Sequence, residues 1–303
     1  MTEQDQPKMS EQDLQEWVGH TESCEDNLTV NLVQKLAVTL DNTPPDAGDV
    51  LPRLWHWALF AIPRPTQELG PDGYPEFGGF LPPAEGRSRM WVGGRIDFIH
   101  PLLVGKPAER KSTLQEITHK KGQSGDLMFV TVHHEYVQDF VACIREERDI
   151  VYRMPGPFQS RSSWQTPPEA AWSCEVEPSS TMLFRYSAVG FNAHRIHYDQ
   201  EYATQVEGYD GLVVHGSLAT LLMYREFMKN NPGTVPVSLT YRSLRPLISP
   251  KPFIVAGHLV SKEVASGDAE AGGEDNSRTG TAKLWVEQDG TMAHEAELQF
   301  RYV

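Results

Sequence analysis

The chain has 303 residues, of which 39% are hydrophobic and 22% charged, a globular composition that excludes an intrinsically disordered protein. Its 41 acidic residues outnumber 27 Lys and Arg, giving a formal net charge of −14. This balance argues against a nucleic-acid or anionic-membrane binder, since both need a basic surface. A small polyanionic ligand stays compatible, because it needs only a few local cations.

The cysteines and the polar start of the chain predict a cytoplasmic protein. Cys24, Cys143 and Cys174 are widely spaced and form no Cys-x-x-Cys motif, so we expect reduced thiols and neither a zinc knuckle nor a redox pair. Residues 1–16 are polar and acidic, without the apolar core of a signal peptide. No apolar run approaches the roughly 18 residues of a membrane span.

The first half begins with a predicted amphipathic helix at 28–40, which a Pro-Pro pair ends. The apolar segment 51–61 follows and should be buried. Its His56 lies between two tryptophans, and we interpret it as a core residue. A long loop rich in Pro and Gly is expected at 64–89. Strands are then predicted at 90–99, 112–118, 127–136 and 144–152.

A segment rich in proline and serine, 155–171, is interpreted as a linker. Beyond it, apolar side chains at helical spacing predict a helix at 217–228, which an Asn-Asn-Pro-Gly sequence ends. An acidic, Gly-rich stretch at 266–277 is expected to form a flexible hairpin tip. Strands are predicted at 235–241, 253–264, 279–287 and 292–302.

The two halves repeat each other. Pro-Leu-Leu-Val-Gly-Lys-Pro at 101–107 matches Pro-Leu-Ile-Ser-Pro-Lys-Pro at 246–252, an offset of 246 − 101 = 145 residues, and comparable strands surround both. Such a long offset indicates a duplicated domain rather than a solenoid. We therefore expect an N-terminal domain at 1–154, the linker, and a C-terminal domain at 172–303. Only the second copy has a His-rich segment and a long helix, so the first keeps the scaffold without the chemistry.

The His-rich segment, Phe-Asn-Ala-His-Arg-Ile-His-Tyr-Asp at 191–199, contains Asn192 and His197. A later Val-Val-His-Gly sequence ends at Gly216, where the predicted helix begins. Backbone amides at a helix start are unpaired and carry partial positive charge, and a glycine there lets a ligand oxygen approach closely. The pattern therefore offers a proton-transfer group, a polar orienter and an oxyanion-stabilising helix start.

Two other interpretations of these residues were weighed. His194, His197, Asp199 and His215 are residue types that bind metal ions, but their spacing fits neither a two-histidine helix motif nor a zinc ribbon. We therefore expect no metal. Alternatively, the histidines only pack and hydrogen-bond in a non-catalytic segment, and the residues alone do not exclude this.

Together with Tyr202-Ala203 and Val214-His215-Gly216, the 191–199 segment resembles the hydratase motif of the MaoC-like, R-specific enoyl-thioester hydratase and dehydratase family. This resemblance implies an α+β double hotdog, two antiparallel sheets each wrapped around a helix, with the long central helix in the second half. The family has a carboxylate where this chain has Asn192. That departure resembles the mesaconyl-C4-CoA/itaconyl-CoA hydratase subgroup and its mitochondrial acyl-carrier dehydratase relatives.

The resemblance implies a hydro-lyase that adds water reversibly to an α,β-unsaturated acyl-CoA. Mesaconyl-C4-CoA or itaconyl-CoA hydration to citramalyl-CoA, in itaconate degradation, is the leading choice. A general 3-hydroxyacyl-thioester dehydratase acting on CoA or acyl-carrier thioesters is the alternative. No cofactor is expected, because the CoA thioester is the substrate.

Two further classes stay open. A hotdog thioesterase usually places a carboxylate on or near the central helix, and here the second half of that helix has only Glu226, which is too far along. A non-catalytic acyl-binding subunit would keep the fold without needing the Asn192/His197 pair. Homodimer formation stays open as well.

Carried over residue by residue, the resemblance makes His197 the acid–base group, the Gly216 N–H the oxyanion donor and Asn192 the group that holds the water. Substrate binding is expected from His194, Arg195, His215, Tyr241, Arg242 and Arg245. A dicarboxylic acyl group would also require a buried arginine facing its pocket, because an unpaired carboxylate in a closed site is costly.

Overall fold

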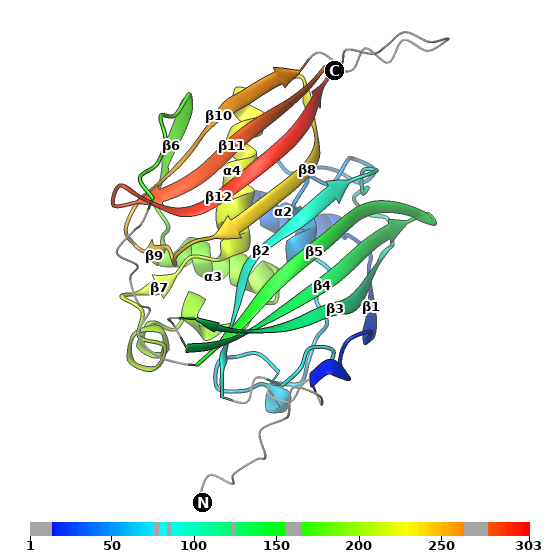
Figure 1. The fold of residues 1–303 in the computed structure, drawn as a ribbon. Coiled ribbons are helices and arrows are strands. Elements are labelled where there is room, and N and C mark those ends of the chain that lie inside the picture. The colour runs from blue at the N-terminus through cyan, green and yellow to red at the C-terminus, as the bar shows by residue number, and fades with distance from the viewer. Residues whose placement is uncertain (1–13, 76–78, 84–85, 123–124, 155–164, 264–277) are drawn as a thin grey trace, which may run out of the picture.

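A computed structural model describes residues 14–75, 79–83, 86–122, 125–154, 165–263 and 278–303 (Figure 1). The first half contributes five strands to the main sheet. They are β1 (Thr21–Asp26), β2 (Ser88–Phe98), β3 (Ala108–Gly122), β4 (Gly125–Gln138) and β5 (Val141–Arg153).

The second half contributes five more strands, which are β6 (Trp172–Val176), β8 (Thr234–Ser243), β10 (Phe253–Glu263), β11 (Thr279–Gln288) and β12 (Thr291–Tyr302). The ten strands form one sheet in the order β1-β3-β4-β5-β2-β8-β12-β11-β10-β6, with every neighbouring pair antiparallel. Two short strands, β7 (Leu212–Val213) and β9 (Ile248–Ser249), pair separately. The sheet is continuous because β2 pairs with β8, and the predicted double hotdog is confirmed.

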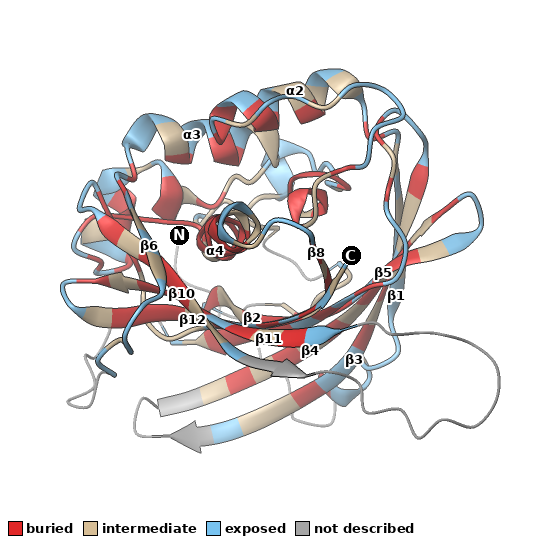
Figure 2. Cartoon of the chain, turned by 90° about the horizontal axis from the view of Figure 1, so that it is seen from above, coloured by how far each residue is buried: buried red, intermediate tan, exposed pale blue. Residues whose placement is uncertain are grey.

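The helices lie on the concave side of this sheet. In Figure 2, α2 (Val30–Thr39) and α3 (Ser180–Val189) form an outer layer, and α4 (Gly216–Asn230) lies between them and the strands. Ten of the fifteen α4 residues are buried, as expected of a helix that is surrounded on all sides. The first half has only the 3₁₀ turn η1 (Trp55–Ala58) where the second has α4, so its central helix is missing.

Equivalent hydrogen bonds recur in the two halves. The Gln138 side chain pairs with the backbone of Leu103 and also donates to the Lys106 carbonyl. Gln288 makes the same three bonds to Ile248 and Lys251, which lie 145 residues after Leu103 and Lys106. The short sequence match thus marks a repeated tertiary contact.

The ends of α2 and α3 repeat each other too. Asn42 N–H donates to the Ala37 carbonyl just beyond α2, and Asn192 N–H donates to the Ser187 carbonyl just beyond α3. Each residue of the second pair lies 150 positions after its counterpart in the first. The Asn192 loop is therefore the second copy of a turn that the first half also has.

Several predicted boundaries change. β3 is twice the predicted length and β4 and β5 extend beyond theirs at both ends, because their polar outward side chains hide the strand pattern. The predicted loop at 64–89 contains a short 3₁₀ turn, η2 (Thr66–Glu68), and ends when β2 begins at Ser88. The expected hairpin tip at 266–277 and residues 155–164 of the expected linker lie outside the described residues, so the domain division stays a prediction.

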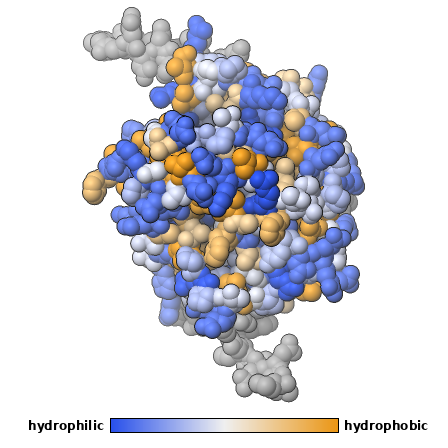
Figure 3. Space-filling model, turned by 180° about the vertical axis from the view of Figure 1, so that it is seen from behind, coloured by the Kyte–Doolittle hydropathy of each residue, from blue (hydrophilic) through white to orange (hydrophobic). Residues whose placement is uncertain are grey.

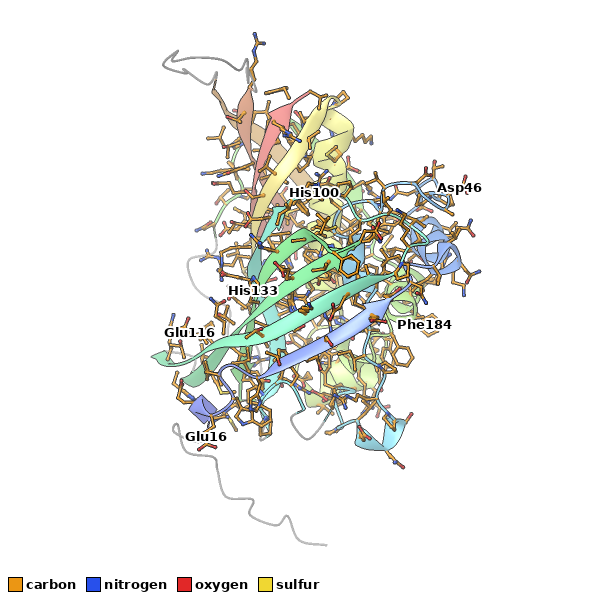
Figure 4. All side chains as sticks on the ribbon, turned by 90° about the vertical axis from the view of Figure 1, so that its right-hand side faces the viewer. Glu16, Asp46, His100, Glu116, His133 and Phe184 are labelled. Atoms are coloured by element: carbon orange, nitrogen blue, oxygen red, sulfur yellow. The ribbon has the colours of Figure 1, made fainter. Side chains whose placement is uncertain are left out.

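The face covered by the helices is mostly hydrophilic with separate hydrophobic patches (Figure 3). Glu116 and His133 lie on the outer face of the sheet, and Phe184 of α3 lies on the opposite side of the molecule (Figure 4). Within the described residues, no helix is both long and apolar enough to span a bilayer.

Candidate active site

His197 ends a short 3₁₀ turn, η3 (Arg195–His197), and its side chain is buried with 7% exposed. Its Nδ1 lies 2.7 Å from the Val213 carbonyl oxygen. Because a carbonyl can only accept, Nδ1 carries the hydrogen and Nε2 presents a lone pair. Burial lowers the pKa of His197 to about 4, although the Val213 bond opposes this. The imidazole is therefore neutral at pH 7, and Nε2 can accept a proton.

His215 orients the His197 ring. The two imidazoles stack with centroids 3.6 Å apart and planes 19° apart, and the His215 Nε2 lies 2.8 Å from the Ser187 Oγ of α3. Burial also lowers the pKa of His215 well below its usual value, so both rings are neutral and do not repel each other. His215 is the residue before α4, which places the stacked pair at the start of the central helix.

Gly216 begins α4, and its N–H belongs to the first turn, which has no partners within the helix. A Cβ at this position would lie 3.4 Å from the Ser243 Oγ, 3.7 Å from the His294 Cε1 and 3.8 Å from the Trp91 carbonyl oxygen. Glycine thus keeps space beside the positive end of the helix, where a developing oxyanion is stabilised. Val213, which holds His197, lies three residues upstream, so the base and this donor share one short segment.

Asn192 uses its side-chain oxygen locally, since Oδ1 accepts the His194 N–H at 3.0 Å. Its Nδ2 has no recorded partner among the described residues. The backbone bond to Ser187 connects the Asn192 loop to the residue that holds His215. Asn192 can therefore offer N–H donors to the oxygen of a water molecule, but it cannot take its proton.

A loop of the first half covers the motif. Arg195 N–H donates to the Asp72 carbonyl, and the Arg195 Nη1 donates to the Pro71 carbonyl. Gly73 has a φ of +90°, and a Cβ there would lie 1.9 Å from the Ala193 carbonyl oxygen, so only glycine fits. The predicted long loop is thus fastened across the site by backbone contacts between the halves.

His194 is buried beneath this loop. Its ring lies 4.6 Å from the Tyr74 ring and 5.4 Å from the His197 ring, measured between centroids. Arg195 does not face the His197 ring with a free charge, because its guanidinium pairs with Asp199 at 2.7 Å and lies over the Tyr202 ring. The contacts of both residues order the loop, and substrate binding by them stays a prediction.

Two of the predicted substrate-binding cations are not brought to the site. Arg242 is exposed and pairs with Glu295 at 2.9 Å. The Arg245 guanidinium donates to the carbonyls of Gln288 and Thr291 in the β11–β12 turn. Tyr241 faces inward, where its hydroxyl accepts the Trp91 indole N–H at 3.0 Å. Adjacent residues on β8 point to opposite faces, which explains why Tyr241 lies inside and Arg242 outside.

A buried polar network in the first half was missed from the sequence. The Glu146 carboxylate accepts hydrogen bonds from Trp57, Tyr136 and Arg148, and the His56 Nε2 lies 3.4 Å away. Burial alone would raise the pKa of Glu146, but the Arg148 guanidinium and the other donors hold it below its ordinary value. His56 is 1% exposed, which confirms that it is a core residue. An ion pair and packed rings fill the space around η1.

The described residues contain no group of three or more His, Cys, Asp or Glu side chains placed to hold a metal ion. The histidines of the site instead make pairwise contacts through their ring faces and through Ser187 and Val213. The arrangement supplies one proton acceptor, one set of side-chain donors and one helix start. Such a set can add or remove water beside a carbonyl group that becomes an oxyanion.

The role of Asn192 can be tested by two substitutions. Asn192→Ala should lower turnover on the order of 10²-fold through misplaced water. Asn192→Asp should keep substantial activity, because the carboxylate still accepts the His194 N–H, and it should add an acidic limb to the pH–rate profile. Turnover against pH on one enoyl-CoA measures both effects.

Asn42→Ala is the matched control, since it removes the equivalent side chain from the first-half turn, and it should leave turnover unchanged. An Asn192→Ala protein as active as wild type would place Asn192 outside the site.

Known proteins were then compared with this chain. The model of a family described as hydroxyacyl-thioester dehydratase type 2 matches residues 54–249. The chain is 43% identical over 249 residues to mesaconyl-C(4)-CoA hydratase of Chloroflexus aurantiacus, covering 81% of this chain and 89% of that protein. It is 28% identical over 207 residues to the mitochondrial hydroxyacyl-thioester dehydratase type 2 of Schizosaccharomyces pombe, covering 59% and 67%.

Two solved structures share the fold. A MaoC-like dehydratase superposes with a TM-score of 0.72 at 16% identity, covering 96% of this chain and 100% of that one. HtdX of Mycobacterium tuberculosis superposes with a TM-score of 0.61 at 13% identity, covering 93% and 99%.

Proposed function

Because the chain belongs to the hydroxyacyl-thioester dehydratase type 2 family, and is therefore a hydro-lyase, we propose that His197 and Gly216 hydrate a short dicarboxylic enoyl-CoA. Mesaconyl-C4-CoA or itaconyl-CoA, converted to citramalyl-CoA, is the preferred substrate. The observation that carries the proposal is the buried, neutral His197, whose Nδ1–H is held by Val213 and whose Nε2 can accept a proton beside the start of α4.

In the hydration direction, His197 Nε2 takes a proton from water while the water oxygen bonds to the β-carbon. The π electrons of the double bond move toward the thioester, and the Gly216 N–H stabilises the resulting enolate oxygen. The imidazolium then gives its proton to the α-carbon, and the enolate collapses to the thioester. One water molecule is added in total, and no cofactor is required because the thioester carbonyl itself activates the double bond.

A single acid–base residue suffices for this cycle, which fits an asparagine in place of the family carboxylate. The lowered pKa of His197 makes its imidazolium a stronger acid than a free imidazolium, which favours return of the proton to the α-carbon or, in dehydration, to the leaving hydroxyl. The N–H donors of Asn192 can hold the water or hydroxyl oxygen without competing for its proton.

The substrate choice follows the 43% identity to a protein named mesaconyl-C(4)-CoA hydratase, which extends over most of both chains. We also place the reaction in the cytoplasm, in itaconate degradation. The three cysteines are free thiols in the structure, as a reducing compartment would keep them. The second candidate, dehydration of general 3-hydroxyacyl thioesters on CoA or an acyl carrier, is supported by the family model and by the Schizosaccharomyces pombe relative.

A substrate panel tests this choice. With mesaconyl-C4-CoA we expect the enoyl-thioester absorbance to fall while the thioester stays intact, with kcat/KM at least about 10-fold above that for crotonyl-CoA. Absorbance and thiol release should be recorded in parallel. A large preference for crotonyl-CoA would favour the general dehydratase, and release of free thiol would indicate a thioesterase. Binding without turnover of any enoyl-CoA would indicate an acyl-binding subunit.

A further inference from the structure

Arg89, near the start of β2, is a buried cation to which neither the motif nor the mechanism assigns a role. Its side chain is 9% exposed, and its Nε has no hydrogen-bond partner in the part of the chain that the structure describes. The Nη2 donates to the Pro75 carbonyl at 3.0 Å, and among the described residues the carboxylate oxygen paired with it, on Asp72, lies 3.9 Å away, beyond hydrogen-bond distance. A buried guanidinium with an unused donor is costly unless a further anion completes its contacts.

The contacts of Arg89 lead to the catalytic histidine. The guanidinium lies over the Tyr74 ring, 4.9 Å from its centroid, and the Tyr74 ring packs against His194, which in turn contacts the edge of His197. Burial lowers the pKa of His194, and its neighbours His197 and Arg89 lower it further, so the guanidinium acts electrostatically on the ring next to the base. Arg89 and Tyr74 belong to the first half, and the histidines belong to the second.

The position of Arg89 along β2 also relates it to the start of α4. Trp91 lies two residues further along the strand, and its carbonyl oxygen is 3.8 Å from a Cβ built on Gly216. Two residues of a strand span about 6.6 Å, so the Arg89 backbone lies about that far along β2 from the Trp91 backbone, which borders the start of α4. In a C4 dicarboxylic thioester the two carboxyl carbons are separated by three bonds, about 4 Å. An acyl group whose thioester oxygen faces Gly216 and which extends along β2 directs its carboxylate toward the Arg89 end of the strand.

We propose that Arg89 binds the free carboxylate of the dicarboxylic acyl group and thereby selects mesaconyl-C4-CoA-like substrates over simple enoyl-CoAs. This assignment rests on the proposed function and names the determinant of its substrate class. Arg148, the other inward cation on the neighbouring strand, is committed to Glu146 through two donors at 3.0 Å each. Arg89 is the buried arginine that a dicarboxylic acyl group requires.

The test compares kcat/KM for mesaconyl-C4-CoA and crotonyl-CoA in wild type, Arg89→Gln, Arg89→Lys and Arg95→Gln. Arg89→Gln should lower kcat/KM for mesaconyl-C4-CoA about 10²–10³-fold, because the substrate carboxylate loses its buried partner, and should leave crotonyl-CoA within about threefold. Arg89→Lys keeps the charge without the planar fork and should lose less. Arg95 lies on the same strand but faces outward to Glu147 and Asp149, so its variant should match wild type.

Two results would overturn the assignment. Equal losses on both substrates would mean that Arg89 only supports the Tyr74 loop, and no loss on either would mean that the carboxylate binds elsewhere.

A binding measurement distinguishes a wrong role for Arg89 from a wrong choice of substrate. Succinyl-CoA and butyryl-CoA are saturated analogues with and without the carboxylate, and their inhibition constants measure its recognition without turnover. Wild type should bind succinyl-CoA more tightly, and Arg89→Gln should abolish that preference. A wild-type enzyme that turns over crotonyl-CoA far better than mesaconyl-C4-CoA contradicts the proposed substrate. A carboxylate preference that survives in Arg89→Gln contradicts the role of Arg89.

Discussion

Replacing His197 with alanine should lower turnover of an enoyl-CoA about 10²–10⁴-fold while the protein stays folded. We assign the proton transfer to His197 because Asn192 cannot titrate and the His215 Nε2 is engaged with Ser187. The alanine variant also loses the bond to the Val213 carbonyl, so its thermal unfolding should be recorded beside single-turnover rates. A variant that is folded and keeps most of its turnover would remove His197 from the mechanism.

His194→Ala serves as the comparison, since His194 is equally buried and contacts the same ring but has no assigned proton transfer. Its effect should be much smaller. The pH dependence gives an independent check. A free histidine loses its base function below about pH 6.5, whereas His197, with a pKa of about 4, stays unprotonated well below that value. Wild-type turnover should therefore show no limb at pH 6.5 wherever the protein remains folded.

The second large effect is loss of stability in mild acid. Six histidines are buried, and burial lowers the pKa of each below its ordinary value; they are His56, His134, His194, His197, His215 and His294. Below pH 6.5 the unfolded chain binds protons that the folded protein does not, so the free energy of unfolding falls as the pH is lowered. Their contribution is fully present above about pH 6.5 and is lost as the pH falls toward the folded pKa values.

The size of this loss can be bounded from two of the residues. A histidine with a pKa of about 4 in the fold and about 6.5 when unfolded costs roughly 2 kcal/mol of stability between pH 7 and pH 5. His197 and His294 together account for about 4 kcal/mol, a large part of the total of roughly 5–15 kcal/mol, and the other four act in the same direction. We therefore expect urea midpoints to fall steeply from pH 7 to pH 5. Carboxylates titrate mainly below this window.

His294→Gln tests the origin of the effect. It removes one buried titrating group beneath the start of α4, so the difference in unfolding free energy between pH 7 and pH 5 should shrink by about 2 kcal/mol. His100→Gln, at an exposed position, should leave that difference unchanged. A pH dependence that is equal in all three proteins would show that His294 does not contribute.

The sequence pointed to the candidate catalytic segment because the residues that suggest it are close together in the chain. The apolar spacing at 217–228 predicted α4 to within two residues at either end, and the 145-residue repeat anticipated a contact that recurs at Gln138 and Gln288. The contacts that orient His197 could not be predicted from the sequence. The stacking on His215 and the bond to Val213 depend on the path of the backbone after the 3₁₀ turn, and the hydrophobic periodicity of the sequence does not predict that path.

The contribution of the first half could not be read from the sequence. Gly73 is one of many glycines in a Pro- and Gly-rich loop, and only its contact with Ala193 shows why it must be glycine. Arg89 looked like the end of that loop, whereas it is an inward residue of β2. The outward position of Arg242 could have been predicted, because adjacent residues of a strand point to opposite faces and Tyr241 points inward.

The β2–β8 junction joins the two hotdog halves of this one chain into one sheet, and the two halves differ in sequence. In a pair of identical hotdog subunits, one mutation changes both subunits. A substitution that is favourable on one side of a site is therefore also present on the other side. Here a mutation at Arg89 or Gly73 enters once. The first half can therefore differ from the second, with a 3₁₀ turn in place of the central helix, without a change at His197. The consequence is a lower density of catalysts, since a given mass of this protein contains half as many sites as a symmetric pair would.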